Sequence, residues 1–169
     1  MADSTILTLA FDEASQGRFE ALRRAHYPAA LNRIPAHLTL FHQLPGSVET
    51  ERALQEAAAE KAAFEVRVEG VLFLGRGVAL RLESVELTSM HRALSDAFDV
   101  HLTRQDRQRF RPHVVVQNKV SPPEARSLVE ALTRDSERWT AAAVGLDWWD
   151  YLGGPWRHRS RFWFPKARG

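Results

Sequence analysis

The sequence contains no cysteine, which excludes disulfide bonds and thiolate metal sites from the 169-residue chain. It also has no apolar run that approaches the roughly 18 residues of a membrane-spanning helix. The first 15 residues, MADSTILTLAFDEAS, lack the charged start and the long apolar stretch of a secretory signal. We therefore expect a cytoplasmic protein without membrane attachment.

Lysine is scarce as well. The net charge is only +2, but just three of the 23 basic residues are lysines, so nearly all of the positive charge is arginine. A guanidinium group can bind two phosphate oxygens at once, which suits a phosphorylated partner. The amino-acid usage of the source organism is an equally good explanation. Two segments concentrate these residues, namely Arg104, Arg107, Arg109 and Arg111, and Arg157, Arg159 and Arg161.

The overall composition indicates one globular domain over residues 1–169. Apolar residues make up 44% of the chain and charged ones 26%, a balance typical of proteins with a packed core. Strand patterns alternate with helical ones in the order strand–helix–strand–helix–strand, and the order then repeats. We therefore expect a duplicated α+β fold with two lobes, approximately 1–77 and 78–169, between which strands can be exchanged.

The boundaries of the expected elements follow from the same patterns. Strands are expected at 4–12, 37–44, 64–75, 78–84, 113–120, 141–153 and 157–165, and helices at 13–27, 50–63 and 86–98. A fourth helix is expected after Ser121. A capping serine, prolines at the first helical positions and Glu124 three residues later form a strong helix-start signature.

Two of these strands begin with a histidine, in IPAHLTLFHQLPG and in FRPHVVVQNKV. Side chains alternate across a strand, so two rows of residues should face away from the core. These rows are His37, Thr39 and Phe41 in the first strand, and Arg111, His113, Val115, Gln117 and Lys119 in the second. Either histidine alone is more often structural. Two of them in matching places of a duplicated pattern favour one shared site between the lobes.

Two imidazoles that face a common point suit phosphodiester chemistry. Histidine has an ordinary pKa of about 6.5, so one ring can accept a proton from the attacking oxygen while the other protonates the leaving oxygen. Thr39 can donate a hydrogen bond to a phosphate oxygen, and a nearby arginine such as Arg111 offsets the charge. This chemistry needs no cofactor. We expect no metal site, because the chain has no H-E-x-x-H motif and neither histidine motif contains a carboxylate.

The segments His37-Leu38-Thr39-Leu40 and His113-Val114-Val115-Val116, with RPHVVVQNKV and the closing GGPW, resemble the paired H-x-[ST]-x motifs of the 2H phosphoesterases. That superfamily includes bacterial 2'-5' RNA ligases and RNA 2',3'-cyclic phosphodiesterases. The resemblance covers nearly the whole chain and implies two antiparallel sheets that face a central cleft, with the helices outside. It implies that His37 is the general acid, His113 the general base and Thr39 a phosphate ligand. The implied substrate is an RNA end or a small nucleotide with a 2',3'-cyclic phosphate, which is opened to a 2'-phosphate or, in reverse, ligated.

The sequence departs from this family pattern at Val115, where a serine or threonine is usual. Valine has the shape of threonine without its hydroxyl, and one lost hydrogen bond to a charged phosphate costs roughly 1.5–3 kcal/mol, or about ten- to a hundred-fold in rate. Gln117, expected on the same face, is a candidate replacement donor. Val115 also motivates a second hypothesis, in which the chain is a catalytically weakened RNA- or nucleotide-binding module of the same fold.

Other residues have more ordinary expected roles. The arginine-rich segment before His113 is either a solvated loop or a phosphate-binding rim, and a third hypothesis makes it a nucleic-acid binder by itself. The tryptophans are expected mostly in the core. One or two aromatic residues are available to stack on a base, and Phe41 is the most natural candidate. His42 is expected on the core side of its strand, and His91 on the surface or within a helix.

Overall fold

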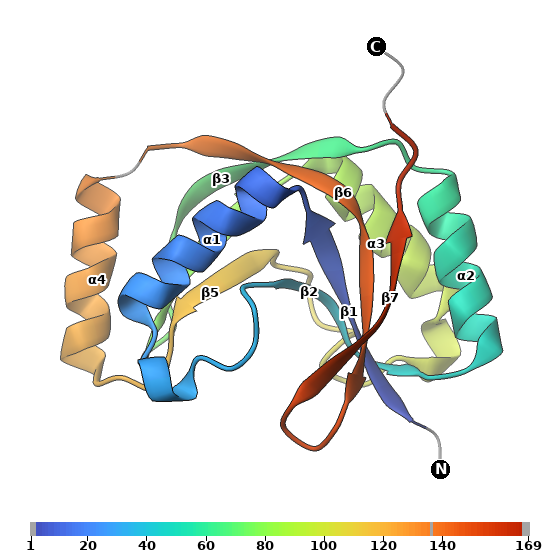
Figure 1. Ribbon diagram of the computed structural model, residues 1–169, viewed down its shortest axis with the longest axis horizontal. Helices are drawn as coiled ribbons and strands as arrows, with labels where there is room; N and C mark the ends of the chain where they lie inside the picture. The colour runs from blue at the N-terminus through green and yellow to red at the C-terminus, as the bar shows by residue number, and fades with distance from the viewer. Residues whose placement is uncertain (1–2, 136, 167–169) are drawn as a thin grey trace.

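The computed structural model describes residues 3–135 and 137–166. Its strands are β1 (Ser4–Phe11), β2 (Leu38–Pro45), β3 (Phe64–Phe73), β4 (Val78–Glu83), β5 (His113–Gln117), β6 (Trp139–Tyr151) and β7 (Trp156–Trp163). Its helices are α1 (Glu13–His26), α2 (Val48–Ala59), α3 (Val85–Ala97) and α4 (Pro122–Arg134), with short 3-10 helices at Ala29–Leu31 and Asp99–His101. None of the described helices has the length and apolar character needed to cross a membrane. The order β–α–β–α–β therefore occurs twice before β7, as expected (Figure 1).

Each α-helix begins at a side chain that accepts a hydrogen bond from a backbone amide of the first turn. These capping residues are Asp12, Ser47, Ser84 and Ser121. A cap of this kind pairs one of the N–H groups that a helix leaves open at its N-terminus. The helix start expected at Ser121 is thus confirmed, with Pro122 in the first turn.

The strands form one seven-stranded antiparallel sheet in the order β2-β1-β6-β3-β4-β5, with β7 paired to β6. The long strand β6 joins the two halves of this sheet, because residues 139–143 pair with β3 and residues 143–150 pair with β1. β3 of the first repeat lies between β6 and β4 of the second. The α+β class is confirmed, and the two sheets implied by the family resemblance are continuous through β6.

The helices divide between the two halves of the sheet (Figure 1). α1 packs against β5, and α4 packs against β3 and β4. α2 contacts α3, β6 and β7 at the other half. β2 and β5 are the first and last strands of the sheet path, yet they contact each other, so the sheet curls back on itself. This curl brings the two histidine strands side by side.

β2 carries a β-bulge directly after Thr39. Thr39 pairs with Thr8 of β1, whereas Phe41 pairs with Leu7, so Leu40 is an extra residue in the ladder. An extra residue shifts the alternation of the strand, and the next side chain turns to the other face. Phe41 is completely buried as a result. The expectation that Phe41 stacks on a base is therefore wrong.

β5 carries the equivalent bulge at Val116. Val115 pairs with Ala79 of β4, but Gln117 pairs with Val78. Gln117 is buried, and its side-chain oxygen has no hydrogen-bond partner within the described residues. Its expected position on the face of Val115 is wrong, so it is not placed to replace the missing hydroxyl. Bulges three residues after each histidine are a further sign of the duplication.

Candidate active site

The two histidine rings are held in the same way. The Nδ1 atom of His37 lies 2.8 Å from the carbonyl oxygen of Pro35, and Nδ1 of His113 lies 2.7 Å from that of Arg111. A carbonyl oxygen only accepts, so Nδ1 carries the proton in both rings and donates it. Nε2 is then the basic nitrogen of each neutral ring and the atom that can exchange protons with a substrate. Both side chains are half-buried.

The rings are close enough for their charges to interact. Burial is the main cause that lowers the pKa of His37 to about 4, and the hydrogen bond to Pro35 opposes it. Positive charge on Arg23, His113 and His42 lowers the pKa further. His37 is therefore neutral at pH 7 when no ligand is bound. A negatively charged phosphate beside the ring acts in the opposite direction and raises the pKa.

The residue two positions after each histidine shares its strand face. Thr39 is half-buried and pairs with Thr8, whose hydroxyl oxygen accepts a 2.9 Å hydrogen bond from Nε1 of Trp149. Val115 is half-buried at the matching place in β5. The site thus offers a hydroxyl group beside His37 and only methyl groups on the β5 side.

A buried arginine that the sequence analysis missed links α1 to this site. Arg23 is 4% exposed, and its guanidinium group packs 4.1 Å from the ring centroid of Tyr27. Its Nη1 donates a 3.0 Å hydrogen bond to the carbonyl oxygen of Val115, and its Nε donates a 2.7 Å bond to Asn32. Burial lowers the pKa of Arg23, but an arginine stays charged near neutral pH. The available signal was its spacing, four residues after Phe19 on the buried side of α1.

An aromatic wall lies on the other side of His37. The ring of Trp156 is centred 4.6 Å from the ring of His37, and Trp149 is centred 6.0 Å from Trp156. Both tryptophans come from the β6–β7 hairpin and are only half-buried. Trp156, rather than Phe41, is therefore the aromatic residue placed beside the histidine.

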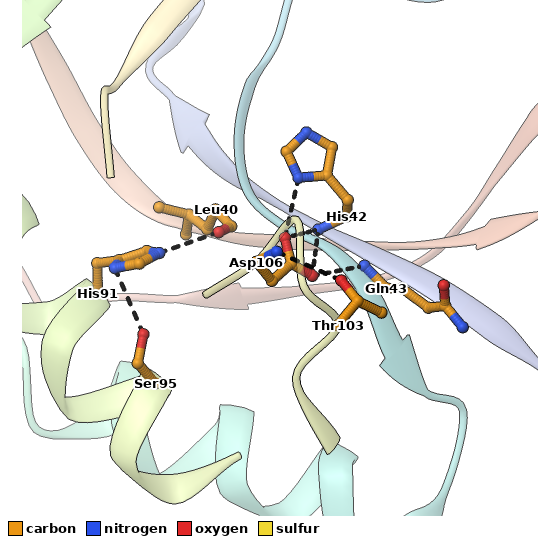
Figure 2. Close-up of polar contacts among 7 residues, drawn as sticks. All are labelled: Leu40, His42, Gln43, His91, Ser95, Thr103 and Asp106. Atoms are coloured by element: carbon orange, nitrogen blue, oxygen red, sulfur yellow. Dashed lines mark hydrogen bonds and ion pairs between the residues drawn. The ribbon is translucent and has the colours of Figure 1, made fainter. Parts of the chain in front are cut away.

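Asp106 anchors the arginine-rich loop to β2 (Figure 2). Its carboxylate accepts hydrogen bonds of 2.9–3.0 Å from the backbone amides of His42 and Gln43 and from Nδ1 of His42. Burial raises the pKa of Asp106, but the hydrogen bonds from His42 and Gln43 outweigh it, and the net effect lowers the pKa. His42 is half exposed rather than directed at the core. The exposed residue Arg111 follows this loop and leads directly into β5.

His91 lies within α3, one of its two expected positions, but its ring is buried in the core. The ring stacks between Phe41 and Phe110, with centroid distances of 4.7 and 3.8 Å and nearly parallel planes. Its Nε2 lies 3.2 Å from the carbonyl oxygen of Leu40, and Nδ1 lies 3.5 Å from the hydroxyl of Ser95 (Figure 2). Burial lowers the pKa of His91, which favours the neutral ring, and the contact of Nε2 with Leu40 helps to fix the bulge of β2.

Two histidine strands that meet where a duplicated antiparallel sheet curls together fit the fold expected of a 2H phosphoesterase. The family model of the 2'-5' RNA ligase superfamily matches residues 11–155. The chain belongs to this superfamily, so the expected family is confirmed. No curated protein is similar enough in sequence to count as a match.

Several solved structures share the fold over nearly their whole length. E. coli LigT in complex with 3'-AMP is 17% identical with a TM-score of 0.62, and the match covers 98% of this chain and 100% of LigT. The protein TT0787 of Thermus thermophilus is 13% identical with a TM-score of 0.68, again over 98% and 100% of the two chains. A structure described as a phosphoesterase is 18% identical with a TM-score of 0.63 and the same coverage. These likenesses establish the fold.

Proposed function

We propose that this chain is a metal-independent phosphoesterase that opens the 2',3'-cyclic phosphate of a nucleotide or an RNA end to a 2'-phosphate. The observation that carries the proposal is the matched pair of rings, each with Nδ1 bonded to the carbonyl oxygen two residues earlier and Nε2 left for proton transfer. Membership in the 2'-5' RNA ligase superfamily supports the reaction class. In the ligation reaction, the 5'-hydroxyl of a second RNA takes the place of water, so its attack on the cyclic phosphate breaks the bond to the 3'-oxygen and leaves a 2'-5' linkage and a 3'-hydroxyl group.

In the proposed reaction, Nε2 of His113 takes a proton from a water molecule as the water oxygen attacks phosphorus. The bond between phosphorus and the ribose 3'-oxygen breaks, and protonated His37 gives its Nε2 proton to that oxygen. The products are a 2'-phosphate and a 3'-hydroxyl group. The negative charge of the bound phosphate supplies the rise in the pKa of His37 that the acid role requires, since the ligand-free value is about 4.

Groups from β2, from α1 and from the segment before β5 surround the phosphate. The hydroxyl of Thr39 donates to a non-bridging oxygen, and the charges of Arg23 and Arg111 offset the charge that grows there in the transition state. Trp156 stacks on the base of the terminal nucleotide beside His37. Nucleotide recognition is also supported by the structures of E. coli LigT, which contain 3'-AMP, NADP+ or ATP.

The test is incubation with a 2',3'-cyclic mononucleotide in the presence of EDTA. We expect the 2'-phosphate as product, with a rate that EDTA does not change and a bell-shaped dependence on pH. Phosphorus NMR distinguishes the 2'-phosphate from the 3'-phosphate. Binding of the substrate without turnover would instead support the weakened binding module, and loss of activity in EDTA would reject the metal-independent mechanism.

A threonine at position 115 would restore the missing hydroxyl and measure how much catalytic efficiency is lost with valine there. Because Gln117 is turned into the interior by the bulge at Val116, it does not compensate, and Val115→Thr should raise kcat/KM for the cyclic nucleotide by about ten-fold or more. The matched control is Val115→Ala, which removes methyl groups without adding a donor and should give no increase. An unchanged rate in Val115→Thr would show that another group already binds this phosphate oxygen.

A further inference from the structure

A groove of about 770 Å³ opens beside the second histidine strand. Its walls come from the sheet strands β3 and β4, from the first turns of α3 and from the end of the arginine-rich loop. Within the described part of the chain, five arginines and one acidic residue line it. They are Arg67, Arg81, Arg92, Arg109, Arg111 and Glu83.

This groove lies next to the candidate active site, on the side of His113. Arg81 of β4 pairs directly with His113 of β5, and partners across an antiparallel ladder carry their side chains on the same face. Arg111 precedes His113 by two residues, and its carbonyl oxygen holds the histidine ring. The groove therefore lies beside His113, with Arg111 and Pro112 at that end, and it extends to Arg92 on α3.

The spread of positive charge fits a chain of phosphates better than one phosphate group. One anion is held by guanidinium groups that converge on it, whereas these five come from two strands, a helix and a loop around an open groove. The hydroxyl groups of Thr88 and Ser89 also line the groove and can donate to phosphate or ribose oxygens. A sugar–phosphate backbone presents both kinds of acceptor at regular intervals.

Glu83 pairs with two of the five arginines. Its carboxylate lies 3.6 Å from Nη2 of Arg67 and forms a second ion pair with Nη1 of Arg81. All three side chains are between 43% and 61% exposed, so these pairs exchange readily with solvent and with a competing anion. Glu83 thus opposes polyanion binding, and its removal should strengthen it.

We propose that this groove binds the backbone of a single-stranded RNA whose terminal cyclic phosphate lies between the two histidines. The inference rests on the proposed function and deepens it, because it makes an RNA end, rather than a free nucleotide, the preferred substrate. The nucleotides before the reacting one follow the groove from His113 toward α3. Each phosphate bound in this way releases counterions, so the binding depends steeply on salt.

The experiment compares a cyclic mononucleotide with an RNA of about eight residues that ends in a 2',3'-cyclic phosphate, and it measures RNA binding separately. Binding is followed by fluorescence anisotropy with an RNA of the same sequence that ends in a 3'-phosphate, between about 50 and 200 mM salt. The groove variant is Arg92→Gln with Arg109→Gln. The matched control is Arg52→Gln with Arg134→Gln, two exposed arginines that lie outside the groove and carry the same charge change.

We expect the wild type to prefer the RNA, and the groove variant to bind it at least about ten-fold more weakly at the lowest salt concentration. The variant should lose about 1.4 from the slope of log affinity against log salt, since each phosphate contact contributes about 0.7. Its activity on the mononucleotide should stay close to that of the wild type. Glu83→Gln should instead raise the affinity for the RNA.

The outcomes separate this inference from the function on which it rests. Equal weakening in the control pair, unchanged binding in the groove variant, or equally tight binding of an acidic peptide of the same charge would each overturn the RNA groove. Absence of turnover with both substrates, while RNA binding still depends on Arg92 and Arg109, would overturn the proposed catalysis and leave the groove supported.

Discussion

His37→Ala and His113→Ala each lower kcat for a 2',3'-cyclic nucleotide by about 10²–10⁴-fold, the range that a general acid or base contributes. KM changes little, because neither ring is the main source of charge that binds the phosphate. The loss of kcat in the double variant should be smaller than the product of the two single losses, because the effects of residues that act together in one step are strongly non-additive. Steady-state kinetics with both single variants and the double variant test this expectation.

A substrate whose leaving group needs no proton distinguishes the roles of the two histidines. 4-Nitrophenolate leaves without needing a proton. On a phosphodiester with this leaving group, His37→Ala should therefore recover most of its lost rate, whereas His113→Ala should not. Recovery in His113→Ala instead would reverse the assigned roles. His101→Ala is the control, because His101 is exposed on a short 3-10 helix and should have wild-type activity. Normal rates in both single variants would end the two-histidine mechanism.

Much of the fold is predictable because its signals are local. The cap at Ser121 and the apolar patterns of the strands depend on neighbours in sequence, and the structure has the expected elements within a few residues. The repeated order of strands and helices also indicates the duplication. The continuity of the two sheets through β6 depends instead on pairing between distant segments, and that is decided by packing of the whole chain.

The bulges explain where the site prediction failed. Strict alternation holds as far as Thr39 and Val115, and it fails at the extra residue that follows each of them. Phe41 and Gln117 lie just beyond those residues and are buried, so both were assigned to the wrong face. A bulge reflects the register with the partner strand, and no single strand carries that information in its own pattern.

Asp106 and Arg23 escaped detection for a related reason. Both are charged residues that are buried in the fold, and a charged residue is normally expected on the surface. Asp106 is stabilised by amides of β2, 64 residues earlier in the chain, and Arg23 by a carbonyl group 92 residues later. Partners so far away in sequence become visible only when the chain is folded.

Arg23→Met should lower kcat/KM for the cyclic nucleotide by about 10²-fold, the effect of removing one fixed electrostatic group from an active site. Arg23 is a positioning residue, because it holds the β5 backbone at Val115 and places a positive charge near His37. The change also leaves the carbonyl of Val115 and the side chain of Asn32 without this donor, which costs roughly 1–3 kcal/mol of stability. Kinetics and urea unfolding measure the two effects separately.

The pH profile distinguishes positioning by charge from a merely structural role. The positive charge of Arg23 lowers the pKa of His37, so its removal raises that pKa and should move the acid limb of kcat/KM upward from about pH 4. Arg23→Lys keeps the charge but not the forked geometry, so it should leave the limb near its original position while kcat/KM still falls. Arg24→Met is the matched control, since Arg24 is the exposed neighbour on α1 and should change neither quantity. A folded Arg23→Met protein with the wild-type rate and an unshifted acid limb would refute the link between α1 and the two histidines.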